Sequence, residues 1–262
     1  MALKFISFES GSKGNCSLVM SDNTAILIDA GLSPRALKCE LGKLGLTMSD
    51  LSGVLITHEH SDHIAWVDKY SEVMDVYSTD KTIKSIIDKS KKLLNVGEVF
   101  NFMFGFDIGD LHINPFPISH DAVDPVGYSI TQDDKKISIA TDSGWVTKEM
   151  FDNIKDSNIL LLEANHDIDM LKKGTYPYWL KQRILGLKGH ICNDVTSSVS
   201  CNIKSINGNL QQLILGHISQ ENNTPDLAYN TVYKKLCEKG LLGDTCVSVA
   251  SQDCATQLFE VL

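Results

Sequence analysis

A run of potential metal ligands, H-x-H-x-D-H over residues 58–63, constrains this chain more than any other feature of its sequence. It follows a short apolar segment that we expect to be a β-strand. Because alternate positions at a strand end point the same way, His58 and His60 can share one cation, while Asp62 and His63 lie past the turn and can face a second. Imidazole and carboxylate groups suit zinc, iron or manganese. A polar loop rich in histidine by chance is the alternative, but 8 histidines in 262 residues make three within six positions a rare accident.

Four further polar residues come where other predicted strands end: Asp29, His120, Asp142 and His217. Alone, each would more often be an ordinary surface or core residue, but with the run they complete two sites. The first expected ligand set is His58, His60 and His120. The second is Asp62, His63 and His217. We expect Asp142 to bridge the two ions, since one carboxylate can give an oxygen to each, and Asp29 to accept an N–H from a ligand histidine.

Apolar strands and helices fill the rest of the chain. We expect strands over residues 3–8, 17–20, 24–28, 53–56, 111–118, 126–131, 136–140, 159–162, 212–215, 247–250 and 258–261. We expect helices opening at Ser33-Pro34 and near His63, and over 79–88, 167–173, 177–186, 193–204 and 224–240. No repeat, linker or low-complexity stretch stands out. The pattern therefore predicts a single domain over residues 1–262, of the α/β (α+β) class, with helices flanking two packed sheets.

Charge and composition bound the function. Lysine and arginine total 24 against 33 acids, a net charge of −9, which disfavours a broad basic surface that grips duplex nucleic acid. The 7 cysteines include no CxxC pair, so neither a disulfide framework nor a cysteine-type zinc site is expected. No apolar run approaches the ~20 residues of a membrane span, and no secretory signal is evident. We expect a cytoplasmic protein with no membrane association; the sequence leaves the oligomeric state open.

These residues carry a resemblance to a known family. In chain order, Asp29, the run over residues 58–63, His120, Asp142 and His217 resemble the metallo-β-lactamase fold superfamily. The resemblance implies a four-layer αββα sandwich with a dinuclear metal site at one edge. The H-x-H-x-D-H motif is specific for the superfamily and only weakly specific for the reaction.

Further stretches narrow the resemblance to one group within the superfamily. These are residues 11–16, 120–128, 141–144, 163–167 and 189–190. Together they resemble the WalJ/YycJ-like group of bacterial proteins, which implies a zinc-dependent 5′-to-3′ DNA exonuclease. The chain is more distantly similar to ribonuclease Z, in which an acidic residue and a Gly-His serve phosphodiester cleavage. Glu163 and His190 of this chain match those positions, which implies the same role for them. The implied cofactors are two divalent transition-metal ions, Zn²⁺ before Mn²⁺ or Fe²⁺.

The chemistry of phosphodiester cleavage assigns roles to three of these residues. Two cations can hold a bridging hydroxide and polarise a phosphoryl oxygen, but the leaving oxygen also needs a proton. We expect His190 to donate that proton, Glu163 to orient His190, and Asp62 to serve as both ligand and catalytic residue. A cap or phosphate contact for His190, and a buried structural role for Glu163, remain alternatives.

The residues expected to contact a nucleic-acid substrate are Lys13, Asn15, His166, Lys181 and Arg183. The Gly-rich turn over residues 11–15 could cradle a phosphate or be a plain hairpin, and His166 could contact a phosphate or cap the next helix. Residues 172–190 hold five basic residues, no acid and interleaved aromatics. That composition suits single-stranded or frayed DNA, although a solvated helix with buried aromatics is the plainer interpretation.

Two other functions stay open on sequence grounds. One is hydrolysis of a small ester, thioester or lactone on the same fold, and the other is a metal-stabilised regulatory protein. Residues 142–144, Glu163 and His190 favour phosphodiesters, and a β-lactamase more often has cysteine at position 142. An intact set of seven ligands argues against a purely regulatory role.

Overall fold

Two β-sheets form the centre of the molecule in the computed structural model, which describes residues 2–97 and 102–261. The first sheet runs in the order β13 (Phe259–Glu260), β1 (Lys4–Gly11), β2 (Gly14–Met20), β3 (Ala25–Ile28), β4 (Gly53–Leu55) and β5 (Val76–Tyr77). The second runs in the order β12 (Cys246–Val249), β11 (Gln212–Gly216), β10 (Ile159–Glu163), β9 (Lys135–Ala140), β8 (Val126–Gln132), β7 (Leu111–Pro117) and β6 (Phe106–Ile108).

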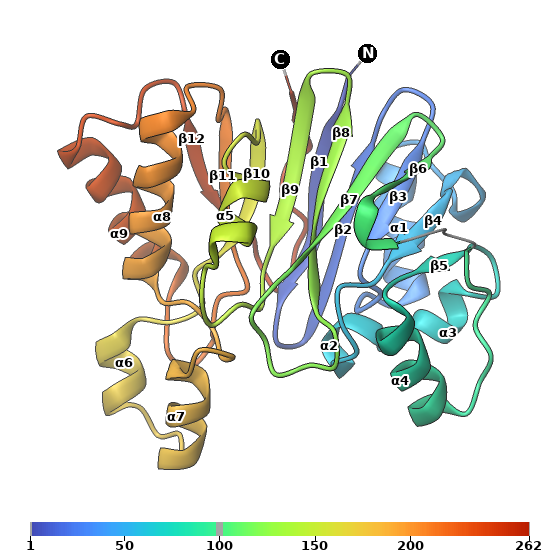
Figure 1. Cartoon of the computed structure of the whole chain (residues 1–262), viewed down its shortest axis with the longest axis horizontal. Coiled ribbons are helices and arrows are strands. Elements are labelled where there is room, and N and C mark those ends of the chain that lie inside the picture. The colour runs from blue at the N-terminus through green and yellow to red at the C-terminus, as the bar shows by residue number, and fades with distance from the viewer. Residues whose placement is uncertain (1, 98–101, 262) are drawn as a thin grey trace.

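Helices cover the outer face of each sheet (Figure 1). The first sheet is covered by α1 (Pro34–Lys43), α3 (Val67–Tyr70) and α4 (Asp80–Ser90), and the second by α5 (Lys148–Ile154), α8 (Asn193–Ile206) and α9 (Pro225–Glu238). This helix–sheet–sheet–helix order confirms the four-layer αββα sandwich and the α/β class. Three helices, α2 (Ser61–Ile64), α6 (Ile168–Lys173) and α7 (Tyr178–Leu185), lie at the edge of the sandwich that is lowest in Figure 1. The 3₁₀ turns η1 (Met48–Asp50) and η2 (Phe102–Phe104) are short connectors.

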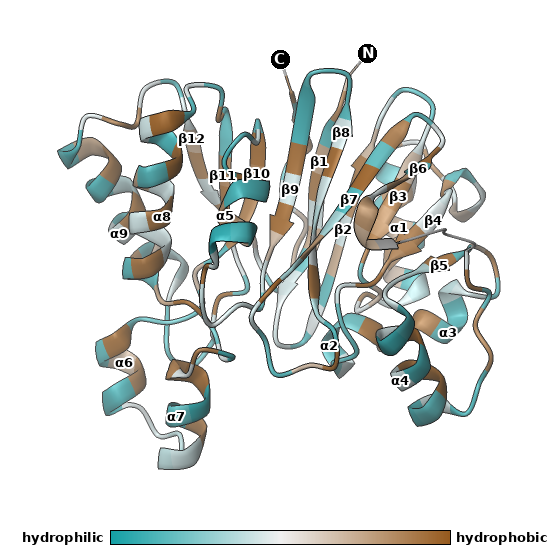
Figure 2. Cartoon of the chain, in the orientation of Figure 1, coloured by the Kyte–Doolittle hydropathy of each residue, from teal (hydrophilic) through white to brown (hydrophobic). Residues whose placement is uncertain are grey.

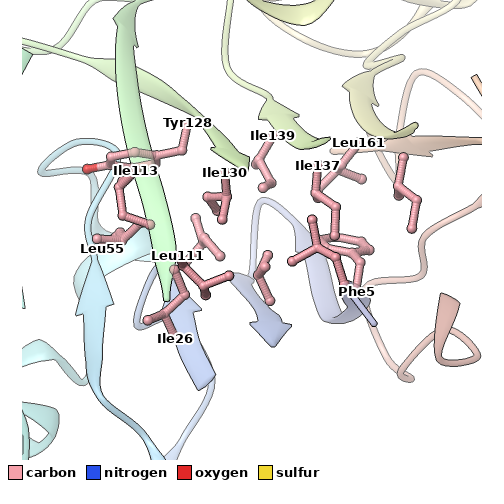
Figure 3. Close-up of a cluster of buried hydrophobic side chains, with 14 of the residues drawn as sticks. Phe5, Ile26, Leu55, Leu111, Ile113, Tyr128, Ile130, Ile137, Ile139 and Leu161 are labelled. Atoms are coloured by element: carbon pink, nitrogen blue, oxygen red, sulfur yellow. The ribbon is translucent and has the colours of Figure 1, made fainter. Parts of the chain in front are cut away.

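The core lies in three apolar layers. Between the sheets, Phe5, Ile26 and Leu161 belong to one buried cluster (Figure 3). On β10 the neighbours Leu160 and Leu162 face the helices instead. This strand is parallel to both of its neighbours and buried on both faces, which explains why it is a continuous apolar run rather than an alternating one. Figure 2 shows hydrophobic residues concentrated in the strands between the helical layers.

Helix starts follow local capping chemistry. Ser33, Thr79 and Thr224 each accept a hydrogen bond from a first-turn N–H, at α1, α4 and α9. The predicted strands and helices are confirmed within a few residues at their ends. The sequence analysis missed α3, α5, β5 and β6, which are short and lack a sustained period. In the part of the chain that the structure describes, no helix is long and apolar enough to cross a membrane, and the cysteines are free.

Candidate metal centre

Strand ends from both sheets converge at the lower edge of the sandwich in Figure 1. The first sheet supplies the loop after β4, which continues into α2, and the second supplies residues that follow β7, β9 and β11. Parallel strands bring their carboxyl ends to one edge, so residues far apart in sequence meet there. All seven predicted metal ligands lie at this edge, within two adjoining clusters.

Three of the converging residues have an unusual backbone. Asp29, Asp142 and His217 have φ angles of 64°, 59° and 51°, in the left-handed region that non-glycine residues seldom adopt. Asp29 and His217 stand directly after a strand and Asp142 two residues after one, and all three are buried. This conformation turns the side chain sharply off the strand direction, and residues held this way tend to occur at functional sites.

The first cluster consists of three histidines, His58, His60 and His120. One nitrogen of each ring lies within 4.8 Å of the others, and His120 Nε2 is 3.2 Å from His60 Nδ1. Burial and the neighbouring imidazoles His63, His120 and His60 lower the pKa of His58 well below its usual value. His58 is therefore neutral, the form in which imidazole binds a metal.

The second cluster consists of Asp62, His63 and His217, again within 4.8 Å of one another. Asp142 lies against it: its Oδ2 is 3.4 Å from His63 Nε2 and its Oδ1 is 3.3 Å from His217 Nε2. Since Asp142 also groups with His58 and His63, its carboxylate stands between the two sets. This is the position expected of a bridging ligand.

Several ligand atoms of these clusters have no hydrogen-bond partner in the part of the chain that the structure describes. His58 Nε2, His217 Nε2 and Asp142 Oδ2 are buried and have no hydrogen-bond partner among the described residues. Burial opposes a charge on His217, but the Asp142 carboxylate, the Asp62 carboxylate 3.8 Å from Nε2 and the hydrogen bond from Nδ1 to Glu163 raise its pKa to about 10. In the absence of metal, the carboxylates thus favour protonated imidazole. A divalent cation would displace those protons and be coordinated by the three atoms that lack a hydrogen-bond partner in the described part of the chain. The residues present fit a pair of metal ions.

Asp29 contacts a histidine of the second cluster. Its Oδ2 is 2.8 Å from His63 Nδ1, and its Oδ1 accepts hydrogen bonds of 2.9 Å from the backbone N–H and the hydroxyl of Thr57. Fixing Nδ1 in this way directs Nε2 of His63 toward the cluster and sets its tautomer. The sequence analysis missed Thr57, although its position just before the motif places it against Asp29.

Glu163 occupies the centre of a second buried network. Its Oε1 accepts from His190 Nδ1 at 2.7 Å and from His217 Nδ1 at 3.0 Å, and its Oε2 accepts from the backbone N–H of Ser143 at 2.9 Å. Burial opposes its ionisation, but His190 and His217 hold its pKa below the usual range. The carboxylate therefore orients His190, whose side chain is 12% exposed, and steadies His217. Because Asp142, Glu163, His190 and His217 also lie within 4.8 Å of one another, His190 stands close to the cluster.

Asn15 lies inside the site rather than at its rim. Its Nδ2 is within hydrogen-bond distance of Gly11 O, Asp62 Oδ2 and His63 Nε2, at 3.0, 3.2 and 3.1 Å. The Gly-rich turn is the tip of the β1–β2 hairpin, with Gly11 paired to Gly14. Lys13 is exposed at this tip.

The helices α6 and α7, with the loop to Gly189, form a projecting segment that we call the arm (Figure 1). Within it, Lys181 Nζ donates to the carbonyls of Lys172 and Gly174 at 2.8 and 2.7 Å. Arg183 makes a two-pronged contact with Asp121, at 2.6 and 3.0 Å. Both predicted substrate contacts thus have partners within the chain. The role of Arg183 in this structure is to tie the arm to the residue that follows His120.

His166 is buried beside this network, and neither of its ring nitrogens has a hydrogen-bond partner in the described residues. Burial lowers its pKa to about 4. It precedes Asp167, which caps α6 by accepting from Met170 N–H at 2.8 Å, so His166 itself is not the cap.

The sequence analysis also missed Asp121 as a site residue. Its carboxylate lies 3.5 Å from His120 Nε2.

Comparison with known proteins identifies related sequences and folds. A family model described as a beta-lactamase superfamily domain matches residues 24–185. The chain is 36% identical over 249 residues to "Exodeoxyribonuclease YycJ" of Bacillus anthracis, covering 92% of this chain and 91% of that protein. It is 35% identical over 276 residues to "Exodeoxyribonuclease WalJ" of Streptococcus pneumoniae strain D39, covering 100% and 99%.

Solved structures at low identity share the fold. The metallo-beta-lactamase fold protein YhfI from Bacillus subtilis superposes with a TM-score of 0.70 at 17% identity, covering 97% of this chain and 99% of that one. Human tRNase Z, short form, gives a TM-score of 0.60 at 15% identity, covering 97% and 98%. The family model and the two relatives bear out the resemblances to the superfamily and to the WalJ/YycJ-like group, and the solved structures show the same fold.

Proposed function

Because this chain belongs to the metallo-β-lactamase superfamily, we propose that it is a metal-dependent exodeoxyribonuclease. One observation carries the proposal: two adjoining three-residue clusters meet at one sheet edge beside the buried carboxylate of Asp142, which groups with His58 of the first cluster and with His63 and His217 of the second. The full-length relatives named exodeoxyribonuclease support nucleic acid as the substrate. We further propose single-stranded or frayed DNA as the preferred form and 5′-to-3′ as the direction.

The two expected ligand sets, with Asp142 between them, would hold two divalent ions. Imidazole and carboxylate donors without thiolate suit Zn²⁺, with Mn²⁺ or Fe²⁺ as alternatives. When bound, such a pair lowers the pKa of water and neutralises charge on a phosphoryl group. Asp62, which is 19% exposed and held by Asn15, is placed to accept a proton from the attacking water.

His190 is placed to supply the other proton. Its Nδ1 bonds to Glu163 at 2.7 Å, so Nε2 is the nitrogen that remains to exchange a proton with the leaving oxygen. The Glu163 contact thus fixes which ring nitrogen faces the leaving group. The Ser143 N–H fixes the far oxygen of that carboxylate, which keeps the His190 ring in one orientation.

We predict two metal ions per chain and a stability that depends on them. Elemental analysis of protein purified without chelator should approach two equivalents. A ligand that binds only the folded state at 1,000 times its Kd adds about 4 kcal/mol, so chelation should lower Tm by on the order of ten degrees for a chain of this size. A value near one ion, or a Tm unchanged by chelation, would contradict the assignment of two sets.

We predict that unpaired lysines of the arm bind the DNA backbone. Lys172 and Lys188 are exposed and have no ion-pair partner among the described residues. Lys172→Glu with Lys188→Glu should raise KM for single-stranded DNA several-fold at low salt and flatten its salt dependence. Cleavage of bis-nitrophenyl phosphate should be unchanged. The charge-matched control is Lys234→Glu with Lys235→Glu on α9; equal effects of the two double variants would indicate a general charge effect instead.

The function is tested with end-labelled oligonucleotides. Purified protein is incubated with 5′-labelled and 3′-labelled single-stranded DNA, duplex DNA and RNA, with added Mn²⁺ or Zn²⁺ or with chelator. The proposal predicts metal-dependent digestion of DNA, fastest on single strands, with the 5′ label released first as a mononucleotide. Early release of the 3′ label would reverse the direction, and equal digestion of RNA would overturn the assignment to DNA.

A further inference from the structure

A hollow of about 470 Å³ opens beside the metal cluster, within the size range of small-molecule sites. Its walls come from the loop after β11, the start of α9 and the loop after β12. Ile218, which directly follows His217, lines one side, and Val249 and Ala250 at the end of β12 line another. We call this hollow the β12 pocket.

Hydrogen bonds connect the β12 pocket to the metal cluster. Ser10 Oγ accepts from the His217 N–H at 2.9 Å, and the Ser10 N–H donates to the carbonyl of Ser251 in the pocket wall, also at 2.9 Å. The side chain of Gln252 donates to Ile218 O at 2.6 Å. The pocket wall and His217 are thus fixed to the same strand end, so a ligand in the pocket would be held in a set position relative to the second cluster.

The hairpin tip adjoins the same wall. A Cβ built on Gly11 would lie 2.3 Å from the side chain of Gln252, which shows how closely the two segments pack. Gly11 also holds Asn15, whose amide contacts Asp62. Lys13 stands two residues further along this hairpin. A phosphate at the cluster would therefore have the pocket wall beside it.

The arm contacts both the metal centre and the pocket wall. At α7, Arg183 contacts Asp121, which is 3.5 Å from His120 of the first cluster. At the start of α6, the Asp167 N–H donates to the carbonyl of Asn222 at 2.9 Å, and the next residue, Asn223, lines the β12 pocket. A DNA strand held by the arm would therefore lie next to both the metal ligands and the pocket.

The lining of the β12 pocket suits an uncharged heterocycle and sugar rather than a phosphate. It combines apolar surface with hydroxyl and amide groups, and it contains no lysine or arginine. The acid at its rim, Asp253, lies close enough to Glu9 to contribute to raising the pKa of that residue, after burial. The lining includes the hydroxyls of Ser219 and Ser251 and the amide of the exposed Gln220, which can donate to or accept from a base or sugar.

We propose that the β12 pocket receives the nucleoside of the 5′-terminal nucleotide, while the scissile phosphate, which is attached to the 3′ oxygen of that nucleoside, lies at the metal cluster. This inference rests on the proposed function and adds to it a site for the strand end. A site for one nucleoside next to the ligands limits cleavage to the bond nearest the end. Because serine hydroxyls and glutamine amides can both donate and accept hydrogen bonds, this lining tolerates any of the four bases, as a general exonuclease requires.

The test uses one substitution that fills the β12 pocket and a matched substitution on β12 that leaves the pocket open. Val249→Phe places a larger side chain in the pocket. Val247→Phe is two residues earlier on β12, packs against the same apolar cluster and does not line the pocket. Binding of thymidine and deoxyadenosine 3′-monophosphates, which carry the phosphate on the side of the scissile bond, is measured by calorimetry, beside KM for single-stranded DNA and hydrolysis of bis-nitrophenyl phosphate.

We expect Val249→Phe to weaken binding of both nucleotides at least about tenfold and to raise KM for DNA by a similar factor. Val247→Phe should match wild type, and hydrolysis of bis-nitrophenyl phosphate and metal content should be unchanged in both variants. Equal nucleotide binding by the two variants would overturn the pocket assignment, as would inorganic phosphate binding as tightly as the nucleotides. If wild type released no nucleotide from DNA, the proposed function would fail instead, and the nucleotide titrations would still decide the pocket.

Discussion

Asp142→Asn is expected to abolish DNA hydrolysis while leaving the fold intact. Asparagine keeps the size of the side chain and tolerates the left-handed backbone at φ 59°, but it removes the charge that stands between the two ligand sets. Metal ions supply several kcal/mol of transition-state stabilisation, and each 1.36 kcal/mol is tenfold in rate. The kcat/KM for DNA should therefore fall by about a thousandfold or more, and metal content should fall from two ions toward one.

The matched control is Asp133→Asn. Asp133 is also an aspartate in the left-handed region, with φ 52°, but it is exposed at the β8–β9 turn. It should retain wild-type activity and two ions. Activity of Asp142→Asn within a few-fold of wild type, or full retention of both metals, would show that the carboxylate does not bridge them.

His190→Ala is expected to slow DNA cleavage while sparing activated substrates. General acid help is typically worth ~10²–10⁴-fold, so kcat on DNA should fall by about a hundredfold or more. A nitrophenyl phosphodiester releases a leaving group that needs no proton, so its hydrolysis should fall much less. Neither expected ligand set includes His190, so both metals should remain bound.

A surface histidine provides the control for this variant. His112 makes the same kind of contact, from Nδ1 to Asp107 Oδ1 at 2.6 Å, at an exposed position. His112→Ala should leave both rates unchanged. Loss of a metal ion in His190→Ala would mean that His190 is a ligand, in keeping with its nearness to Asp142, and an equal rate loss on both substrates would point to phosphate positioning.

The sequence predicted the parts of the fold that depend on local pattern. Apolar runs such as residues 159–162 and capped helix starts such as Ser33-Pro34 depend on period and turn chemistry, which single-sequence inspection detects. The short elements α5 and β6 have little periodicity, and packing against the second sheet decides them. Such tertiary effects override weak local preference.

The candidate site shows a similar division. Polar residues directly after apolar strands, such as Asp142 and His217, were predictable because strand ends of an α/β sandwich converge. Contacts that depend on how loops fold back were not. The pairing of Arg183 with Asp121 joins residues that are 62 positions apart, and charge composition alone suggested instead that Arg183 was free for substrate. Likewise, only the structure places the Asn15 amide between Asp62 and His63.

The central claim is that this metal centre removes nucleotides from a DNA end. The most direct measurement compares a linear single-stranded DNA with a covalently closed circle of the same sequence, each incubated with protein and excess Mn²⁺ or Zn²⁺, and each with chelator. We predict that the linear strand is converted to mononucleotides only when metal is present and that the circle stays intact. Cleavage of the circle at a comparable rate, or digestion of the linear strand that persists under chelation, would contradict this account.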